Sequence, residues 1–489
     1  MSKAYIIGTG PGDEELLTLK GKRVLGECTA VLYDRLVSNN ILNHLNDDCE
    51  IYYCGKEPGA HYKTQEEINE MIVSLAKKGH IVGRIKGGDP YVFGRGGEEV
   101  LALKEAGIEF EVIPGVTSPI AVLNYAGIPI THRGIAQSFH IVTGMSAKNL
   151  NVNFKALAEE NGTLVFMMSL SNIDFIASEL IKYGKDKDTK AAVVMRGTSS
   201  KQKKVIGTLE NISKKAKEAK LKSPCIIVVG DVVSLENELS WYEKKPLFGK
   251  NICVTRSRFQ SKNLKIKLKD LGAEVTEINS IAIKDTSSNL DNYKNNIEEY
   301  DHILFTSVNG VNVFFDYLIR EKIDVRRIKG KCSVVGKATR KALESRGFVP
   351  FKTAKEFLGE GLLKEVAPYV KKEDKVLILS SSKGRNLLND ELSKLGAEVT
   401  RVNIYDVVVG NVKNEKVFDE VDAVLFTSPS TFENMKEIVG LDKIKEKICI
   451  AIGPITNKAL EKDGINAFVC KEHSEDGFLK EIENMLKEV

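Results

Sequence analysis

The chain has 489 residues, of which 42% are hydrophobic and 28% charged, and its formal net charge is +4. This length fits roughly two to four domains of an ordinary soluble globular protein. The small net charge gives no reason to expect a nucleic-acid partner, and the most basic stretch, residues 201–222, is interpreted as a solvated helix face with its leading loop.

The sequence carries no sign of secretion or of a membrane span. The first residues, MSKAYIIG, leave no room for the apolar region of a signal peptide. Residues 112–131 are uncharged but contain three prolines and two glycines, which predicts a buried loop and helix. Eight cysteines are scattered without a C-x-x-C pair, a pattern of reduced thiols rather than of a metal site. We expect a cytoplasmic protein.

Strand-like runs alternate with helical stretches along the chain, which predicts α/β domains with largely parallel sheets. Residues 240–251 are polar, contain Pro246 and Gly249, and precede the strand-like run ICVTR, so we place a domain boundary there. Before this boundary, the clearest strand-like runs are Val31–Tyr33, His80–Ile85, Thr163–Met168, Ala191–Met195 and Cys225–Val229.

The first glycine turn, GTGPGDEELLTLKG at 8–21, follows a short apolar run. Gly8 and Gly10 match the start of the dinucleotide motif G-x-G-x-x-G, whose amides receive a pyrophosphate. However, Asp13 stands where the third glycine belongs, and Pro11 removes an amide donor. The turn is therefore either a plain tight turn or one shaped for a ligand without a phosphate.

After the boundary the chain repeats itself, which predicts two copies of an α/β unit. Two similar lobes commonly hold a ligand in the cleft between them. The paired segments, about 120 residues apart, are LGAEVT at 271–276 and 395–400, HILFTSVNGV at 302–311 and AVLFTSPSTF at 423–432, and SVVGKATRKALESRGF at 333–348 and CIAIGPITNKALEKDGI at 449–465.

Four motifs of the first half stand in a specific order: GTGPGDEELLTLKG (8–21), VLYDRL (31–36), VGRIKGGDPYVFGRGGEE (82–99) and PGVTSPIAVLNYAGIPITHR (114–133). KGGDP follows a predicted strand, where open α/β sheets place their ligands. Together the motifs resemble the uroporphyrinogen-III C-methyltransferases of the tetrapyrrole methylase family. The resemblance covers residues 1–244 and implies two lobes, about 1–114 and 115–244.

This resemblance implies that S-adenosylmethionine, which carries no phosphate, is the methyl donor and lies between the two lobes, with S-adenosylhomocysteine as its product. It also implies a homodimer formed through this half. The cofactor contacts that it implies are Pro11, Gly87, Gly88, Asp89, Val92, Thr117, Ser118, Met168 and Gly197.

The resemblance also assigns catalytic roles. It makes Asp34, in YDRL, the proton acceptor and Lys56, in CGKEPG, the proton donor. The alternative for Asp34 is a helix N-cap after a strand, and the alternative for Lys56 is a solvated loop lysine.

Three arginines and one aromatic residue are candidates for binding the substrate. Arg84, Arg95 and Arg133 suit its carboxylates, because a guanidinium binds a carboxylate through two hydrogen bonds. Each can instead form a structural ion pair. Phe93 either lines the pocket or fills the core.

The second half carries VTRS (254–257), FTSVNGV (305–311), IY (404–405), FTSPS (426–430) and IGPITNKAL (452–460). With the duplication, these marks resemble uroporphyrinogen-III synthase. The resemblance implies two flavodoxin-like lobes joined by a two-strand ladder. Lobe one is expected at 249–284 plus 408–489, and lobe two at 285–407.

The substrate implied for this half is the linear tetrapyrrole hydroxymethylbilane, and no cofactor is implied. Hydroxyls at strand ends suit its carboxylates, or they cap helices. The resemblance makes Tyr405 a catalytic residue that helps the terminal hydroxyl leave; its alternative is half-buried core. The hydroxyl residues are Thr306, Ser307, Thr427, Ser428 and Thr456.

The expected function is a bifunctional enzyme. The second half would cyclise hydroxymethylbilane to uroporphyrinogen III. The first half would methylate this product at C2 and C7 with two S-adenosylmethionine, giving precorrin-2 for sirohaem or cobalamin. The alternatives are a methylase for another corrin intermediate, a second half that only binds tetrapyrrole, and a solute receptor, which the missing signal peptide opposes.

Overall fold

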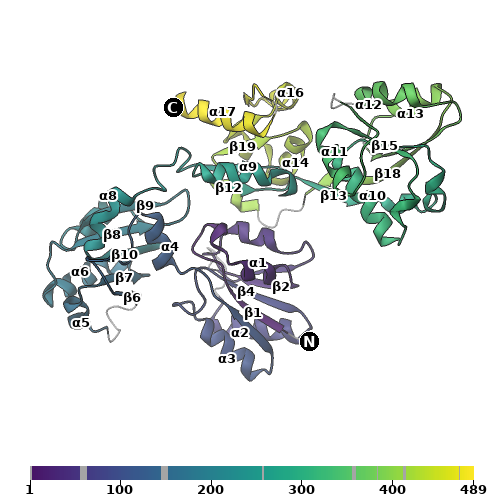
Figure 1. The fold of residues 1–489 in the computed structure, drawn as a ribbon. Helices are drawn as coiled ribbons and strands as arrows, with labels where there is room; N and C mark the ends of the chain where they lie inside the picture. The colour runs from purple at the N-terminus through teal and green to yellow at the C-terminus, as the bar shows by residue number, and fades with distance from the viewer. Residues whose placement is uncertain are drawn as a thin grey trace. The chain divides into compact units, whose positions relative to one another are not determined.

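In the part of the chain that it describes, the computed structural model has four β-sheets, three of five strands and one of six; Figure 1 shows the fold. Residue contacts divide the chain into two units. Unit 1 comprises Met1–Ile278, Lys413–Phe432 and Val439–Val489, and unit 2 comprises Asn279–Val412 and Glu433–Ile438. The predicted α/β fold class is confirmed. The structure describes residues 3–55, 63–144, 152–255, 258–354, 359–382, 384–410, 415–472 and 474–488.

The first sheet is parallel throughout, in the order β3-β2-β4-β1-β5. Its strands are β1 (Lys3–Gly8), β2 (Ala30–Tyr33), β3 (Glu50–Tyr53), β4 (Ile81–Lys86) and β5 (Glu109–Ile113). Its helices are α1 (Leu19–Leu25), α2 (Gln65–Lys77) and α3 (Gly96–Glu105).

Both faces of this sheet are covered. Along β1, Ile6 packs in the core cluster that includes residues of α2 and α3. Its neighbours Tyr5 and Ile7 pack in the cluster that includes residues of α1. Since side chains alternate across a strand, a strand covered on both faces is a continuous apolar run rather than an alternating one. This coverage leaves the ends of the strands as the places where polar loops gather.

The second sheet, in the order β6-β7-β10-β8-β9, is mixed. Only β6 and β7 are parallel, whereas β10 is antiparallel to both β7 and β8, and β8 to β9. The expectation of largely parallel sheets is therefore wrong for this sheet. The strands are β6 (Phe139–Thr143), β7 (Thr163–Met167), β8 (Lys190–Met195), β9 (Lys203–Thr208) and β10 (Cys225–Val229), and the helices are α4 (Ser118–Tyr125), α5 (Phe154–Glu159), α6 (Ile173–Lys182), α7 (Ile212–Glu218) and α8 (Glu236–Leu239).

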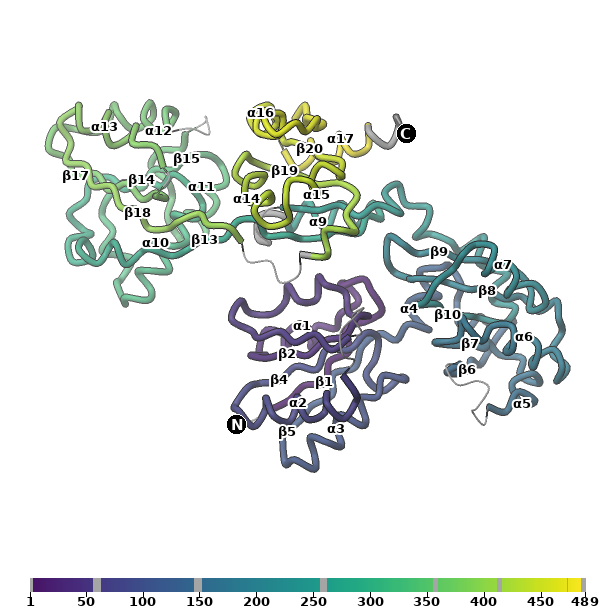
Figure 2. The backbone as a smooth tube through the Cα atoms, turned by 180° about the vertical axis from the view of Figure 1, so that it is seen from behind, coloured from purple at the N-terminus to yellow at the C-terminus, as the bar shows by residue number. Residues whose placement is uncertain are grey.

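The third sheet, β12-β11-β19-β20-β21, is parallel and is built from two distant parts of the chain. In Figure 2 the yellow-green β19 and β20 lie beside the teal α9. The strands are β11 (Asn251–Val254), β12 (Glu274–Glu277), β19 (Ala423–Phe426), β20 (Ile448–Ala451) and β21 (Phe468–Val469), and the helices are α9 (Arg258–Asp270), α14 (Pro429–Val439), α15 (Leu441–Lys445), α16 (Pro454–Lys462) and α17 (Glu475–Glu488).

The fourth sheet, β13-β18-β17-β14-β15-β16, is parallel except for the antiparallel pair of β13 and β18. The strands are β13 (Ile281–Asp285), β14 (His302–Phe305), β15 (Lys331–Val335), β16 (Lys352–Ala354), β17 (Lys375–Ser381) and β18 (Glu398–Val409), and the helices are α10 (Val308–Arg320), α11 (Gly336–Ser345), α12 (Gly359–Val366) and α13 (Leu387–Lys394).

The repeated segments form the same elements in both copies. β14 and α10 correspond to β19 and α14, and β15 and α11 correspond to β20 and α16. LGAEVT follows α9 and leads into β12, and its second copy follows α13 and leads into β18. The copies nevertheless contribute to different sheets, because the chain leaves the third sheet after β12 and returns to it at β19.

Three expectations about composition can be compared with the structure. All eight cysteines are free and buried. Across the described residues, no cluster of three or more histidine, cysteine or acidic side chains is arranged to hold a metal ion, and no described helix has the length and apolarity of a membrane span. The basic stretch 201–222 holds α7 but begins with a strand, β9, rather than with a loop.

Candidate active sites

Three glycine-containing loops meet at the carboxyl edge of the first sheet. The loops after β1 and β4 form an isolated bridge, in which the Gly88 amide donates to the Gly10 carbonyl at 2.7 Å. A Cβ on Gly115, after β5, would lie 2.2 Å from the Gly88 oxygen, and a Cβ on Gly8 would lie 2.6 Å from the Gly115 nitrogen. Only glycine allows backbones to approach this closely.

The KGGDP loop is held open by its own aspartate. The Asp89 carboxylate accepts hydrogen bonds from the Tyr91 amide at 2.8 Å and from the Gly115 amide at 3.1 Å. Gly88 has φ +71°, and a Cβ there would meet only the Ser118 nitrogen, at 4.0 Å. The loop thus presents backbone to open space, as a ligand cradle requires.

The remaining predicted cofactor residues lie in these loops or follow other strands. Pro11 lies in the first loop, and Val92 is half-buried after KGGDP. Thr117 is the N-cap residue of α4, whose first residue is Ser118. Met168 follows β7 and is 41% exposed. Gly197 follows β8, and a Cβ there would lie 2.4 Å from Val122.

Backbone strain gathers around these residues. Among the described residues, eight non-glycine residues have a positive φ. Five of them belong to these loops: Phe93, Arg95, Met168, Arg196 and Thr198. A positive φ is costly for a residue with a Cβ, and such strain persists mainly at functional sites. The strain marks the segments around 93–95, 168 and 196–198 as a candidate ligand site.

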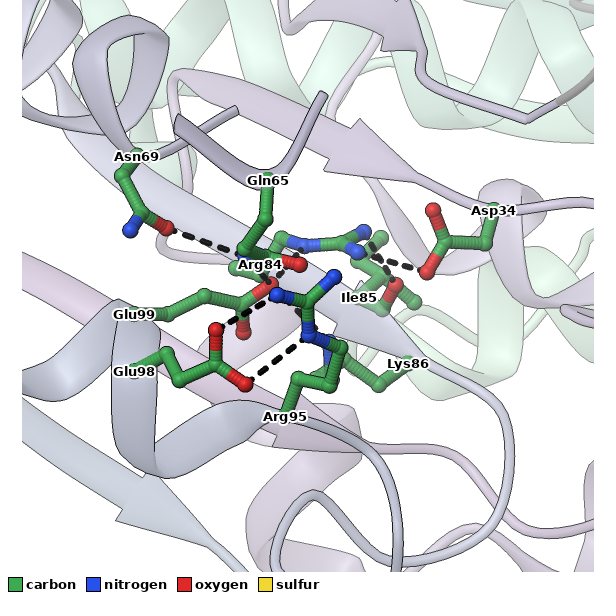
Figure 3. Close-up of polar contacts among 9 residues, drawn as sticks. All are labelled: Asp34, Gln65, Asn69, Arg84, Ile85, Lys86, Arg95, Glu98 and Glu99. Carbon is green, nitrogen blue, oxygen red and sulfur yellow. Dashed lines mark hydrogen bonds and ion pairs between the residues drawn. The ribbon is translucent and has the colours of Figure 1, made fainter. Parts of the chain in front are cut away.

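A buried ion-pair network lies beside this loop edge (Figure 3). Arg84, on β4, donates from Nη2 to Asp34 Oδ2 at 2.6 Å and from Nε to Glu99 Oε1 at 2.8 Å. Lys86 donates to the same Glu99 oxygen at 2.9 Å. The side chains of Arg84, Lys86 and Glu99 are 3%, 5% and 0% exposed, whereas that of Asp34 is 32% exposed. Asp34 is thus the accessible end of the network.

The pKa values of Arg84 and Lys86 shift in opposite directions in this environment. Burial opposes the positive charge of Arg84, but the carboxylates of Glu99 and Asp34 outweigh it and hold the pKa of Arg84 above its ordinary value. For Lys86, burial and the neighbouring Arg84 lower the pKa, although Glu99 opposes the shift. Arg84 is therefore the fixed positive charge beside Asp34.

The placement of Asp34 argues against its alternative role. The next helical segment begins at Asn39 with Ser38 as its N-cap, and the Asp34 side chain pairs with Arg84 instead of capping it. In Figure 3 the other Asp34 oxygen points away from Arg84, and none of the described residues donates to it. Among the described residues, the Asp34 side chain is held through one oxygen, which pairs with Arg84.

The other predicted residues of the first half have varied surroundings. Arg84 is 2% exposed, and its Nε, Nη1 and Nη2 each donate a hydrogen bond within the protein. This favours the structural ion pair over the predicted role of Arg84 in binding substrate. Arg95 donates to Glu98 at 2.6 and 2.8 Å and remains half exposed. Arg133 is exposed, and Phe93 is 42% exposed. Lys56 lies outside the described residues.

Sequence reasoning missed Glu99 and Lys86. A signal was present: Arg84 and Lys86 are two residues apart on an apolar strand, so both side chains face one side of a sheet that is covered on both faces. Two buried cations on one face require a carboxylate partner. The acidic residues after GRGG were the nearest candidates.

In the fourth sheet, Tyr405 is 5% exposed and packs in the core cluster between β18 and α10. Its hydroxyl lies 2.7 Å from Ser307 Oγ. Ser307 is also the N-cap residue of α10 and accepts a hydrogen bond from the Gly310 amide at 3.0 Å. Thr306, beside it, is half-buried. Ser307 therefore fulfils the helix-cap alternative, and its contact with Tyr405 brings two predicted residues together.

In the third sheet, Thr427 and Ser428 follow β19 and precede α14. The Ser428 hydroxyl accepts a hydrogen bond from the Thr431 amide at 3.3 Å, as a helix-capping residue does. Thr456 lies within α16 and is 3% exposed. Thr456 is as buried as Tyr405, and its role in substrate binding stays a prediction.

The chain is similar to proteins of tetrapyrrole metabolism. A family model described as tetrapyrrole (corrin/porphyrin) methylases matches residues 3–213, and one described as uroporphyrinogen-III synthase HemD matches residues 262–480. The porphyrin biosynthesis protein HemD of Ruminiclostridium josui is 38% identical over 491 residues, covering 98% of this chain and 97% of the relative.

Two further proteins resemble the first half. An S-adenosyl-L-methionine-dependent uroporphyrinogen III methyltransferase of Methanosarcina barkeri is 47% identical over 240 residues, covering 48% of this chain and 94% of the relative. The solved structure of uroporphyrin-III C-methyl transferase from Thermus thermophilus, complexed with S-adenyl homocysteine, is 39% identical and covers 48% of this chain and 99% of its own, with a TM-score of 0.42.

Proposed function

Because this chain belongs to the family of porphyrin-biosynthesis proteins that join a tetrapyrrole methylase to a uroporphyrinogen-III synthase, we propose that it is a bifunctional enzyme. Its second half cyclises hydroxymethylbilane to uroporphyrinogen III. Its first half methylates that product at C2 and C7 to give precorrin-2, with two molecules of S-adenosylmethionine consumed. The match to both family models supports the pairing of these activities in one chain.

The observation that carries the methylase proposal is the open glycine cradle around Gly88. No side chain stands between the Gly88 backbone and the space above it, so a ligand could approach that backbone closely, and Pro11 and Asp13 beside it suit a ligand without phosphate. We assign S-adenosylmethionine to this site. The residues that would hold it are Pro11, Gly87, Gly88, Asp89, Val92, Thr117, Ser118, Met168 and Gly197.

S-adenosylmethionine supplies an electrophilic methyl group, whose transfer to a pyrrole carbon leaves a proton to be removed. The glycine loops position the reactants, which accounts for much of the acceleration in such a transfer. Asp34 then accepts the proton at the oxygen that points away from Arg84, while Arg84 holds the other oxygen in place. Lys56 is proposed as the proton donor, and Arg95, Arg133 and Phe93 as substrate contacts.

For the second half we propose that Tyr405, hydrogen-bonded to Ser307, assists departure of the terminal hydroxyl of hydroxymethylbilane. Thr306, Thr427 and Ser428 would bind substrate carboxylates, and no cofactor takes part. The division into a methylase at 1–244 and a synthase with lobes at 249–284 plus 408–489 and at 285–407 remains part of the proposal. So do the homodimer through the first half and the cytoplasmic location.

The full chain tests the two activities in one assay. Hydroxymethylbilane alone should be converted to uroporphyrinogen III, and addition of S-adenosylmethionine should convert this product to dimethylated precorrin-2, as mass spectrometry would detect. The alternatives, another corrin substrate or a non-catalytic second half, would be supported if uroporphyrinogen III stayed unmethylated or hydroxymethylbilane closed only to isomer I. The match to the HemD relative over 98% of this chain does not favour them.

Tyr405→Phe should slow formation of uroporphyrinogen III by about tenfold, the effect of one lost transition-state hydrogen bond of ~1.4 kcal/mol. Non-enzymatic closure then competes, so the products shift towards isomer I, as chromatography would detect. Only one hydrogen bond is removed from the folded protein, at a cost of about 0.5–1.5 kcal/mol.

Tyr317→Phe is the matched control. Tyr317 lies in the same core cluster, is 1% exposed, and donates its hydroxyl to Asp291 at 2.7 Å. It should lose similar stability and keep the normal isomer ratio. If Tyr405→Phe melts lower but still makes isomer III at the normal rate, the tyrosine serves packing alone.

A further inference from the structure

Glu99 is the most deeply buried member of the network beside the methylase loops. Its side chain has no exposed surface, and it comes from the first half of α3. One carboxylate oxygen, Oε1, accepts hydrogen bonds from Arg84 at 2.8 Å, Lys86 at 2.9 Å and Gln65 at 3.3 Å. The other oxygen, Oε2, is buried and has no hydrogen-bond partner among the described residues.

Burying the charged side chains of Glu99, Arg84 and Lys86 costs desolvation free energy, which suggests a role other than stabilising the fold. A buried ion pair contributes little net stability compared with apolar residues of similar size, and an unpartnered carboxylate oxygen adds a desolvation cost. The remaining partners are fixed as well, since Gln65 also donates to Asn69 at 3.0 Å. Glu99 therefore supplies a rigid negative charge at a defined place.

Glu99 is connected to Asp34 through a single residue, Arg84. Figure 3 shows Arg84 lying between Glu99 and Asp34. Its Nε is bonded to Glu99, its Nη2 to Asp34, and its Nη1 to the Ile85 carbonyl at 3.2 Å. Because a guanidinium is planar, fixing the Nε edge and Nη1 fixes the direction in which Nη2 points.

We propose that Glu99 is a positioning residue of the methylation reaction, which orients Arg84 so that Arg84 holds Asp34 where it accepts the proton. This inference rests on the proposed function of Asp34. Glu99 itself does not touch the substrate. Its effect on turnover should pass entirely through the Arg84–Asp34 pair.

The test is a double-mutant cycle in the full chain. Glu99→Gln keeps the shape but removes the charge, and should lower kcat for methylation about 10- to 100-fold, since small misplacements of a catalytic group have effects of this size. The KM for uroporphyrinogen III and the affinity for S-adenosylmethionine should change less than twofold. If Glu99 acts through Asp34, the variant carrying both Glu99→Gln and Asp34→Asn should be no slower than Asp34→Asn alone.

Two further variants complete the design. Glu105→Gln changes an exposed carboxylate at the end of the same helix and should leave kcat unchanged. Glu99→Asp keeps the charge and should recover at least part of the lost turnover. It replaces Glu99→Gln in the cycle if thermal unfolding shows that the glutamine variant does not fold.

The outcomes separate this inference from the proposed function. If Asp34→Asn keeps normal turnover, the assignment of the base is wrong and the role of Glu99 falls with it. If Asp34→Asn is slow and the second substitution adds its full effect, Asp34 keeps its role but Glu99 acts elsewhere, and the inference is overturned. Loss of both substrate affinity and turnover in Glu99→Gln would also overturn it, because it would indicate general disruption of the site.

Discussion

Asp34→Asn is expected to lower methylation turnover by about 10²–10⁴-fold, the usual loss when a general base is removed, while methyl-donor binding stays nearly intact. The amide has nearly the same shape as the carboxylate and can still accept the hydrogen bond from Arg84 Nη2, which is 2.6 Å from Asp34 in the native protein. It cannot accept the proton at the oxygen that points away from Arg84. Single-turnover kinetics would report the loss directly.

Asp47→Asn, at an exposed position shortly before β3, serves as the control and should turn over normally. Calorimetry with S-adenosylmethionine would verify that the Asp34 variant still binds the donor. A loss of less than about threefold is outside the range for a general base, and Asp34 would then have a structural role only.

Gly88→Val is expected to weaken S-adenosylmethionine binding by about 100-fold, or roughly 2.8 kcal/mol at about 1.4 kcal/mol per factor of ten. Two effects combine. The φ of +71° is unfavourable for a β-branched residue, and the side chain would occupy the open space above the loop into which we place the ligand. Calorimetry on the full chain measures the result.

Gly107→Val separates these two effects. Gly107 has a similar φ of +69°, and a Cβ there would meet no described atom within 4 Å. It lies between α3 and β5, outside the KGGDP loop. A valine there would have the same backbone strain as at position 88 but would not enter the proposed donor site. Equal donor affinity in the two variants would mean that the KGGDP loop does not hold the donor.

The full chain is preferable to the first half alone because the first glycine loop has partners in α9. Lys269 lies 3.0 Å from Asp13 and 3.1 Å from Glu14, and Lys265 also pairs with Glu14. Glu14 is buried, and these lysines lower its pKa against the opposing effect of burial. A chain ending near residue 245 would leave both carboxylates without these cations.

Much of the first half could be predicted from its sequence because its signals are local. The run His80–Ile85 followed by KGGDP predicts a strand and a ligand loop, and the structure has β4 at Ile81–Lys86. The antiparallel β10 was not predictable in this way, since an apolar run such as Cys225–Val229 does not encode its direction. Strand direction is set by tertiary pairing.

Strand β9 was not predicted from the sequence because its first residues are charged. It is the edge strand of the second sheet, and it begins with Lys203 and Lys204. Lys203 is exposed, and an exposed lysine on an edge strand opposes pairing with other chains, whereas Lys204 pairs with Glu236 and Glu243. The burial of Glu99 was not predicted for a similar reason, because an acidic residue near the start of a helix is usually exposed.

The discontinuous third sheet has a consequence for synthesis on the ribosome. β11 lies between β12 and β19, and its residue Ile252 pairs with Ala423, about 170 residues later. At about 5–20 residues per second, roughly 10 to 30 s separate the emergence of the two strands. During this interval the first two sheets are complete in sequence, while β11 has one edge without its partner. An unpaired edge invites pairing with another nascent chain, so conditions that slow elongation after residue 278 should lower the yield of folded protein more than those that slow it earlier.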